Sequence, residues 1–157
     1  MGHETDAFIG KMPINFDKVN LYGLAVALEN NFAIVFLDEK HLLIWEERLR
    51  LNCRRSESNS EFEGELIHFF AKEIGVSNYV IAKFDYEFFG VLYNNGIKED
   101  KGEINFILQK LGVKLSDKQN EFDELNLNDY RLSEAFYWDG ELNFAKHKKN
   151  VIQGYAK

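Results

Sequence analysis

Six consecutive apolar residues, Phe32 to Leu37, constrain the fold of this chain more than any other feature of its sequence. The run has the length of a strand, and it lacks the alternation of polar and apolar residues that marks a half-exposed strand. A continuous apolar run of this length is typical of a strand buried on both faces of a sheet. We therefore expect residues 32–37 to form a buried strand.

The sequence predicts four helices, over about residues 18–30, 61–74 and 102–111 and from Ser116 onward. The clearest is 61–74, because Ser60 and Glu63 form a capping-box pattern before it and Gly75 is a natural stop after it. Its apolar residues recur at helical spacing. We expect them to share one core with the strand 32–37, a core that contains Phe62, Leu66, Phe70, Ile74, Ile34 and Phe36.

Strand signals lie between the predicted helices. Residues 79–84 and 86–93 are rich in β-branched and aromatic residues, and the tight-turn dipeptide Asn95-Gly96 follows them. Residues 47–54 alternate, which favours a strand, although Leu42, Trp45, Leu49 and Cys53 also fit a helix. Near the C-terminus, residues 135–138 and 141–145 flank Asp139-Gly140, a pattern that predicts a β-hairpin with a type I′ turn.

These elements predict an α+β fold in a single domain over residues 1–157. Helices and strands interleave without regular βαβ spacing, so we expect a mixed or antiparallel sheet packed with about four helices, and a C-terminal β-hairpin. A chain of this length can bury a substantial core without disulfides or metals. A serine-rich stretch near 54–60 predicts a surface loop, and residues 146–157 form a basic tail.

Charge is unevenly distributed along the chain. There are 26 acidic and 19 basic residues, a net charge of −7, which disfavours direct binding to nucleic acid because phosphates repel it. Residues 117–141 hold eight acids and two bases, a net charge of −6. The acidity is thus concentrated in about a sixth of the chain, and it suits a basic partner.

Signals of catalysis or metal binding are weak. Cys53 is the single cysteine and lies on the apolar side of the alternating segment, so we expect an inert buried thiol. Glu65 and His68 have the E-x-x-H spacing of di-iron sites, but those sites need two such motifs and two further glutamates. His68 falls opposite the apolar stripe of its helix, so we expect it in solvent. We expect no catalytic residue, no metal and no cofactor.

Arginines raise the question of an anion site. In the strand interpretation of residues 47–54, Arg48, Arg50 and Arg54 line one face, spaced to meet phosphates or carboxylates. Pairing with the surplus acids of the chain explains them as well, and the sequence leaves both open.

The most unusual pattern is the mixture of aromatic and acidic residues in the last third of the chain. Tyrosine and tryptophan ringed by carboxylates are suited to anchor on a basic protein surface. The alternative is that the rings belong to the core. The candidate partner-binding residues are Asp129, Glu134, Tyr137, Trp138, Asp139 and Glu141.

In its small size, acidity, aromatic content and lack of catalytic motifs, the chain resembles the bacterial immunity proteins that neutralise nuclease-type toxins. The resemblance implies a non-catalytic toxin inhibitor that occupies a basic site on its protein partner. Two alternatives stay open: a small enzyme with a site of carboxylate, histidine and arginine groups, and a phage or mobile-element mimic of nucleic acid. No stretch of the sequence has the 18 or so apolar residues of a membrane span, and the N-terminus is polar, so we expect a cytoplasmic protein that does not bind membranes.

Overall fold

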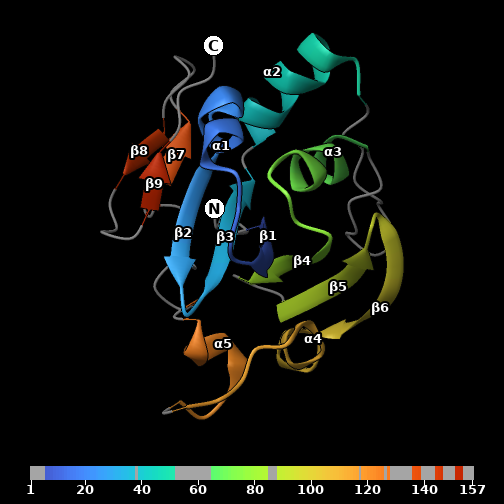
Figure 1. The fold of residues 1–157 in the computed structure, drawn as a ribbon, viewed down its shortest axis with the longest axis vertical. Helices are drawn as coiled ribbons and strands as arrows, with labels where there is room; N and C mark the ends of the chain where they lie inside the picture. The colour runs from blue at the N-terminus through green and yellow to red at the C-terminus, as the bar shows by residue number, and fades with distance from the viewer. Residues whose placement is uncertain are drawn as a thin grey trace, which may run out of the picture.

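The strand β1 (Asp6–Lys11) lies at the centre of a seven-stranded sheet (Figure 1). The computed structural model describes residues 6–37, 39–51, 65–84, 88–116, 118–125, 127, 136–138, 144–146 and 151–153. The strand order is β6-β5-β4-β1-β3-β2-β9, and each neighbouring pair is antiparallel. The other strands are β2 (Ala25–Glu29), β3 (Phe32–Leu37), β4 (Asn78–Phe84), β5 (Phe88–Asn94), β6 (Ile97–Glu103) and β9 (Val151–Gln153).

Helices cover both faces of this sheet. α1 (Phe16–Tyr22), α2 (Glu39–Leu49) and α3 (Glu65–Glu73) pack on one face, and α4 (Ile104–Leu111) and α5 (Glu121–Glu124) pack on the other (Figure 1). The α+β class is therefore confirmed, and of the two predicted sheet types the antiparallel one is right.

The strand β3 confirms the prediction for residues 32–37, since all six side chains are buried. Its residues alternate between two separate apolar clusters: Ile34 and Phe36 face α4 and α5, whereas Ala33 and Val35 face α1 to α3. The prediction of one shared core is wrong. Leu66, Phe70 and Ile74 lie in the second cluster, across the sheet from Ile34 and Phe36, and Phe62 is outside the described residues.

The predicted helix 18–30 is wrong in its second half. Asn15 caps α1 by accepting a hydrogen bond from the backbone N–H of Lys18. Gly23 then takes a left-handed conformation (φ 65°) that ends the helix. The buried residues that follow form β2, the strand next to β3.

The predicted strand over residues 47–54 is also wrong where it can be compared. The segment up to Leu49 belongs to α2, which packs Leu42 and Trp45 into the core at helical spacing. Arg50 follows in a left-handed conformation (φ 56°). Residues 52–60, which include Cys53 and the predicted loop near 54–60, are outside the described residues.

The runs at 79–84 and 86–93 correspond to β4 and β5, as predicted. Asn95 (φ 52°) and Gly96 (φ 82°) form the tight turn into β6, a strand that the sequence did not predict. β6 has one neighbouring strand and carries mainly charged side chains, so it lacks an apolar pattern.

The remaining helices begin later than predicted. Glu103 caps α4 through its carboxylate, which accepts from the backbone N–H groups of Asn105 and Phe106. α5 begins after its cap Asn120 and not at Ser116. The Ser116 backbone N–H and hydroxyl both donate to the buried carboxylate of Glu124 instead, at 2.8 and 2.9 Å.

At the C-terminus, β7 (Phe136–Trp138) and β8 (Phe144–Lys146) pair as a separate two-stranded sheet. Trp138 pairs with Phe144, whereas a two-residue turn at Asp139-Gly140 would pair it with Glu141. The predicted tight hairpin is therefore not confirmed. The segment predicted as a basic tail contains the last residue of β8 and all of β9, which pairs with β2 at the sheet edge.

Candidate functional site

Of the six predicted partner-binding residues, the structure describes the backbone of two. Tyr137 and Trp138 lie on β7, which pairs with β8 (Figure 1). The other four, Asp129, Glu134, Asp139 and Glu141, are outside the described residues.

The predicted row of arginines does not form. Arg48 lies in the last turn of α2, where its guanidinium carbon is 5.0 Å from the centre of the Trp45 ring. Arg50 follows the helix in an exposed position, and Arg54 is outside the described residues. Arg48 thus contacts an aromatic ring in a cation–π interaction and shares no strand face with the others.

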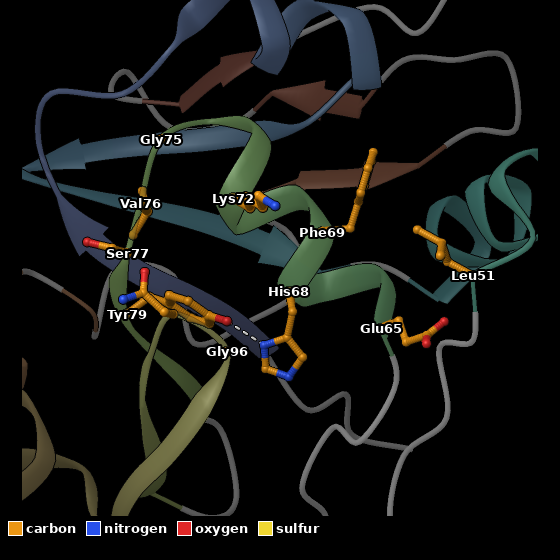
Figure 2. Close-up of a pocket in the computed structure, with 11 residues that line it drawn as sticks. Leu51, Glu65, His68, Phe69, Lys72, Gly75, Val76, Ser77, Tyr79 and Gly96 are labelled. Carbon is orange, nitrogen blue, oxygen red and sulfur yellow. Dashed lines mark hydrogen bonds between the residues drawn. The ribbon is translucent and has the colours of Figure 1, made fainter.

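A pocket of about 570 Å³, the α3 pocket, runs along the outer side of α3 (Figure 2). Leu51 and Phe69 lie toward one end of it, and Ser77, Tyr79 and Gly96 toward the other. α3 contributes three polar side chains to the lining, with Glu65 at the Leu51 end and His68 and Lys72 nearer to Tyr79. The volume is within the range of about 300–1,000 Å³ that is usual for small-molecule sites.

His68 and Tyr79 are joined by a hydrogen bond between the imidazole Nδ1 and the phenol oxygen (Figure 2). Tyr79 extends from β4 and is only 2% exposed. Its ring stacks on that of Tyr93, with centres 5.6 Å apart, and His68 packs edge-on against the same Tyr93 at 4.6 Å. The imidazole is therefore held by two rings of the sheet.

The direction of this hydrogen bond follows from burial. A buried phenol needs an acceptor for its O–H, and His68 Nδ1 is the one that Tyr79 meets among the described residues. Tyr79 therefore donates and His68 accepts, which places the proton of the neutral imidazole on Nε2. Figure 2 shows this second nitrogen on the side of the ring away from Tyr79.

Burial also keeps both groups uncharged near neutral pH. Desolvation lowers the pKa of His68 below its ordinary value. Desolvation, with the neighbouring Tyr93, raises the pKa of Tyr79. An uncharged imidazole thus lines the pocket. Tyr79 occupies its acceptor nitrogen Nδ1, and Nε2–H is the group left to donate.

Glu73, the last residue of α3, connects this helix to α1. Its carboxylate accepts a 2.7 Å hydrogen bond from the Tyr22 hydroxyl and lies 3.4 Å from the ammonium of Lys18. Burial, together with the carboxylate of Glu73, raises the pKa of Tyr22 to about 12. The Tyr22 bond, with the Lys18 charge, in turn lowers the pKa of Glu73.

Within the described ranges, no three histidine, cysteine or acidic side chains come close enough together to hold a metal ion. Among these residues, no helix has both the length and the apolar character needed to cross a lipid bilayer.

Comparisons with known protein families, with curated proteins and with solved structures found no match for this chain.

The sequence-based expectation for His68 was wrong, and the reason lies in the buried face of α3. The expectation took Leu66 and Phe70 as the centre of that face, but Ile67 and Ala71 are buried too. At 100° per residue, the four buried residues centre the face about 50° farther toward His68 than Leu66 and Phe70 alone do. The imidazole then lies at the edge of the interface with the sheet, half-buried.

Proposed function

We propose that this protein is a non-catalytic binding protein whose α3 pocket binds a ligand that carries a hydrogen-bond acceptor. The observation that supports the proposal is the hydrogen bond from Tyr79 to His68 at the pocket wall. It leaves Nε2–H as the remaining donor of a side chain that lines the pocket, and a donor on a rigid support binds a carbonyl or carboxylate oxygen at small entropic cost. A general base would instead need a free nitrogen lone pair.

The tautomer is directly testable. Long-range proton–nitrogen NMR correlations of His68 are expected to show the proton on Nε2 at neutral pH. A proton on Nδ1 would contradict the proposal, because the pocket would then meet an acceptor.

Binding is testable with a matched pair of fragments. Benzamide, which has a carbonyl acceptor, is expected to shift the backbone amide signals of residues 65–79, and toluene, which is uncharged and lacks an acceptor, is not. Tyr79→Phe removes the donor that keeps the imidazole proton on Nε2. It should weaken benzamide binding by up to about tenfold, the contribution of one hydrogen bond. Tyr22→Phe removes a bonded phenol outside the pocket and should have no effect. Equal binding of both fragments would count against the proposal.

A second candidate function is binding to a basic protein, as in the immunity proteins that the chain resembles. The net charge of −6 over residues 117–141 favours it. So does the location of Tyr137 and Trp138 on β7, which is outside the seven-stranded sheet and is not one of the strands that separate the two apolar clusters. The partner would be a basic protein, such as a toxin domain encoded by the neighbouring gene.

This candidate is testable with the neighbouring gene product. Reversing the charges of Asp129, Glu134, Asp139 and Glu141 should slow association and reduce its dependence on salt. Trp138→Ala should instead speed dissociation, with a loss of about 2 kcal/mol or more at a central contact. The candidate would be rejected if Trp138→Ala unfolded the protein and the charge reversal had no effect on binding.

A further inference from the structure

Three polar side chains follow one another along α3 where it lines the pocket. Glu65 and Lys72 are seven residues apart, which is close to two helical turns, so they project from nearly the same side of the helix. His68 lies between them with its Nε2 proton directed away from Tyr79. The pocket thus presents an acceptor of negative charge, a neutral donor and a positive charge in that order.

The spacing of these groups is that of a short peptide. At a rise of 1.5 Å per residue, the backbones of Glu65 and Lys72 are separated by about 10 Å along the helix axis. Three extended amino-acid residues also span about 10 Å. A free tripeptide has an ammonium group at one end, a carboxylate at the other and amide carbonyls between them.

The apolar part of the pocket lies toward the end where Glu65 is found. Figure 2 shows Leu51 on the same side of the view as Glu65, with Phe69 between Leu51 and Lys72. An apolar side chain on the first residue of a bound peptide would have its contacts there.

On the basis of the proposed function, we infer that the α3 pocket binds a short peptide with free ends. Its ammonium group pairs with Glu65, a backbone carbonyl accepts from His68 Nε2, and its carboxylate pairs with Lys72. An apolar first residue packs against Leu51 and Phe69.

The test uses the full chain and the tripeptide Leu-Gly-Gly in four forms: free, acetylated at the N-terminus, amidated at the C-terminus, and capped at both ends. Affinities are measured by NMR titration at low salt. Acetylation and amidation are each expected to weaken binding about two- to fivefold, the range for exposed ion pairs. Glu65→Gln should abolish the effect of acetylation alone, and Lys72→Gln the effect of amidation alone.

Asp17→Asn and Lys114→Gln remove the same charges at exposed positions outside the pocket, and they should leave all four affinities unchanged. Equal affinity for the free and the doubly capped peptide would overturn the inference while the pocket still binds a carbonyl, as the proposed function states. Failure of every peptide to bind, in a protein that binds benzamide, would overturn the inference alone. Failure of the peptides and of benzamide would overturn both.

Discussion

At the scale of single residues, His68 links the pocket to the stability of the fold. Its imidazole is neutral in the folded state, because burial lowers its pKa and Tyr79 occupies Nδ1 as a donor. In the unfolded chain the same group titrates near its ordinary pKa of 6.5. As pH falls through 6.5, the unfolded chain therefore takes up protons before the folded one does, and the free energy of unfolding decreases.

We expect the stability difference between the wild-type protein and His68→Gln to narrow as pH falls from 7.5 to 5.5. At pH 7.5 the wild-type protein has the hydrogen bond from Tyr79 to the neutral imidazole, and the variant lacks it. At lower pH the imidazole is protonated in the unfolded wild-type chain, which lowers the free energy of unfolding of the wild type but not that of the variant. Urea unfolding of both proteins at several pH values measures this difference in the free energy of unfolding. The variant is its own control for the other histidines, which both proteins share. A difference that is constant or grows toward low pH would show that the pKa of His68 is not lowered in the folded protein.

At the scale of elements, the pocket wall depends on how closely the segment between α3 and β4 approaches the sheet. Gly10 on β1 faces this segment, and a Cβ atom built there would overlap the side chain of Val76. Val76 also lines the pocket. A glycine in the central strand is therefore a requirement of close packing and not of strand formation.

Gly10→Ala is expected to destabilise the protein by about 1–3 kcal/mol, the usual cost of overpacking. It should also change the NMR signals of the pocket, because Val76 has to move. Adding Val76→Ala should recover part of the loss, so that the double variant is more stable than the sum of the single effects predicts. Simple additivity in urea unfolding would mean that the two side chains do not compete for the same space.

At the scale of the whole molecule, the sequence predicts the interior strands β3, β4 and β5, but it misses the other two interior strands, β1 and β2, and the edge strands. β3, β4 and β5 have apolar or β-rich runs because both of their faces are covered. β6 has a polar pattern because it lies at an edge, and β9 has three residues within a lysine-rich segment. Short or edge strands carry little local signal, since their place in the sheet comes from pairing with distant strands.

The sequence did not predict the pocket, because the pocket too depends on contacts between segments that are distant in the chain. Tyr79 meets His68 only because α3 packs across β4, and the sequence gives no direct measure of that packing angle. The E-x-x-H spacing of Glu65 and His68 was visible in the sequence, but the helical wheel placed His68 in solvent. The burial of Ile67 and Ala71 is the further information that changes this interpretation.

The division of the interior into two apolar clusters has an energetic consequence. Ile67 on α3 and Ile107 on α4 are both fully buried, but they lie on opposite faces of the sheet. Ile67→Val and Ile107→Val should each cost about 0.5–1.5 kcal/mol. Because they share no contact, the double variant should equal the sum within about 0.5 kcal/mol.

A pair on the same face provides the comparison. A Cβ atom at Gly90 would meet both Val80 and Ile107, so these two side chains border the same small space under α4. The destabilisation of the double variant Val80→Ala/Ile107→Val should therefore differ from the sum of the two single destabilisations, because each change alters the cavity that the other leaves. If urea unfolding instead showed coupling between Ile67 and Ile107 and none between Val80 and Ile107, the interior would behave as the single core that the sequence suggested. The expected result is that each face of the sheet responds to mutation separately, while the shared strands keep unfolding a single transition.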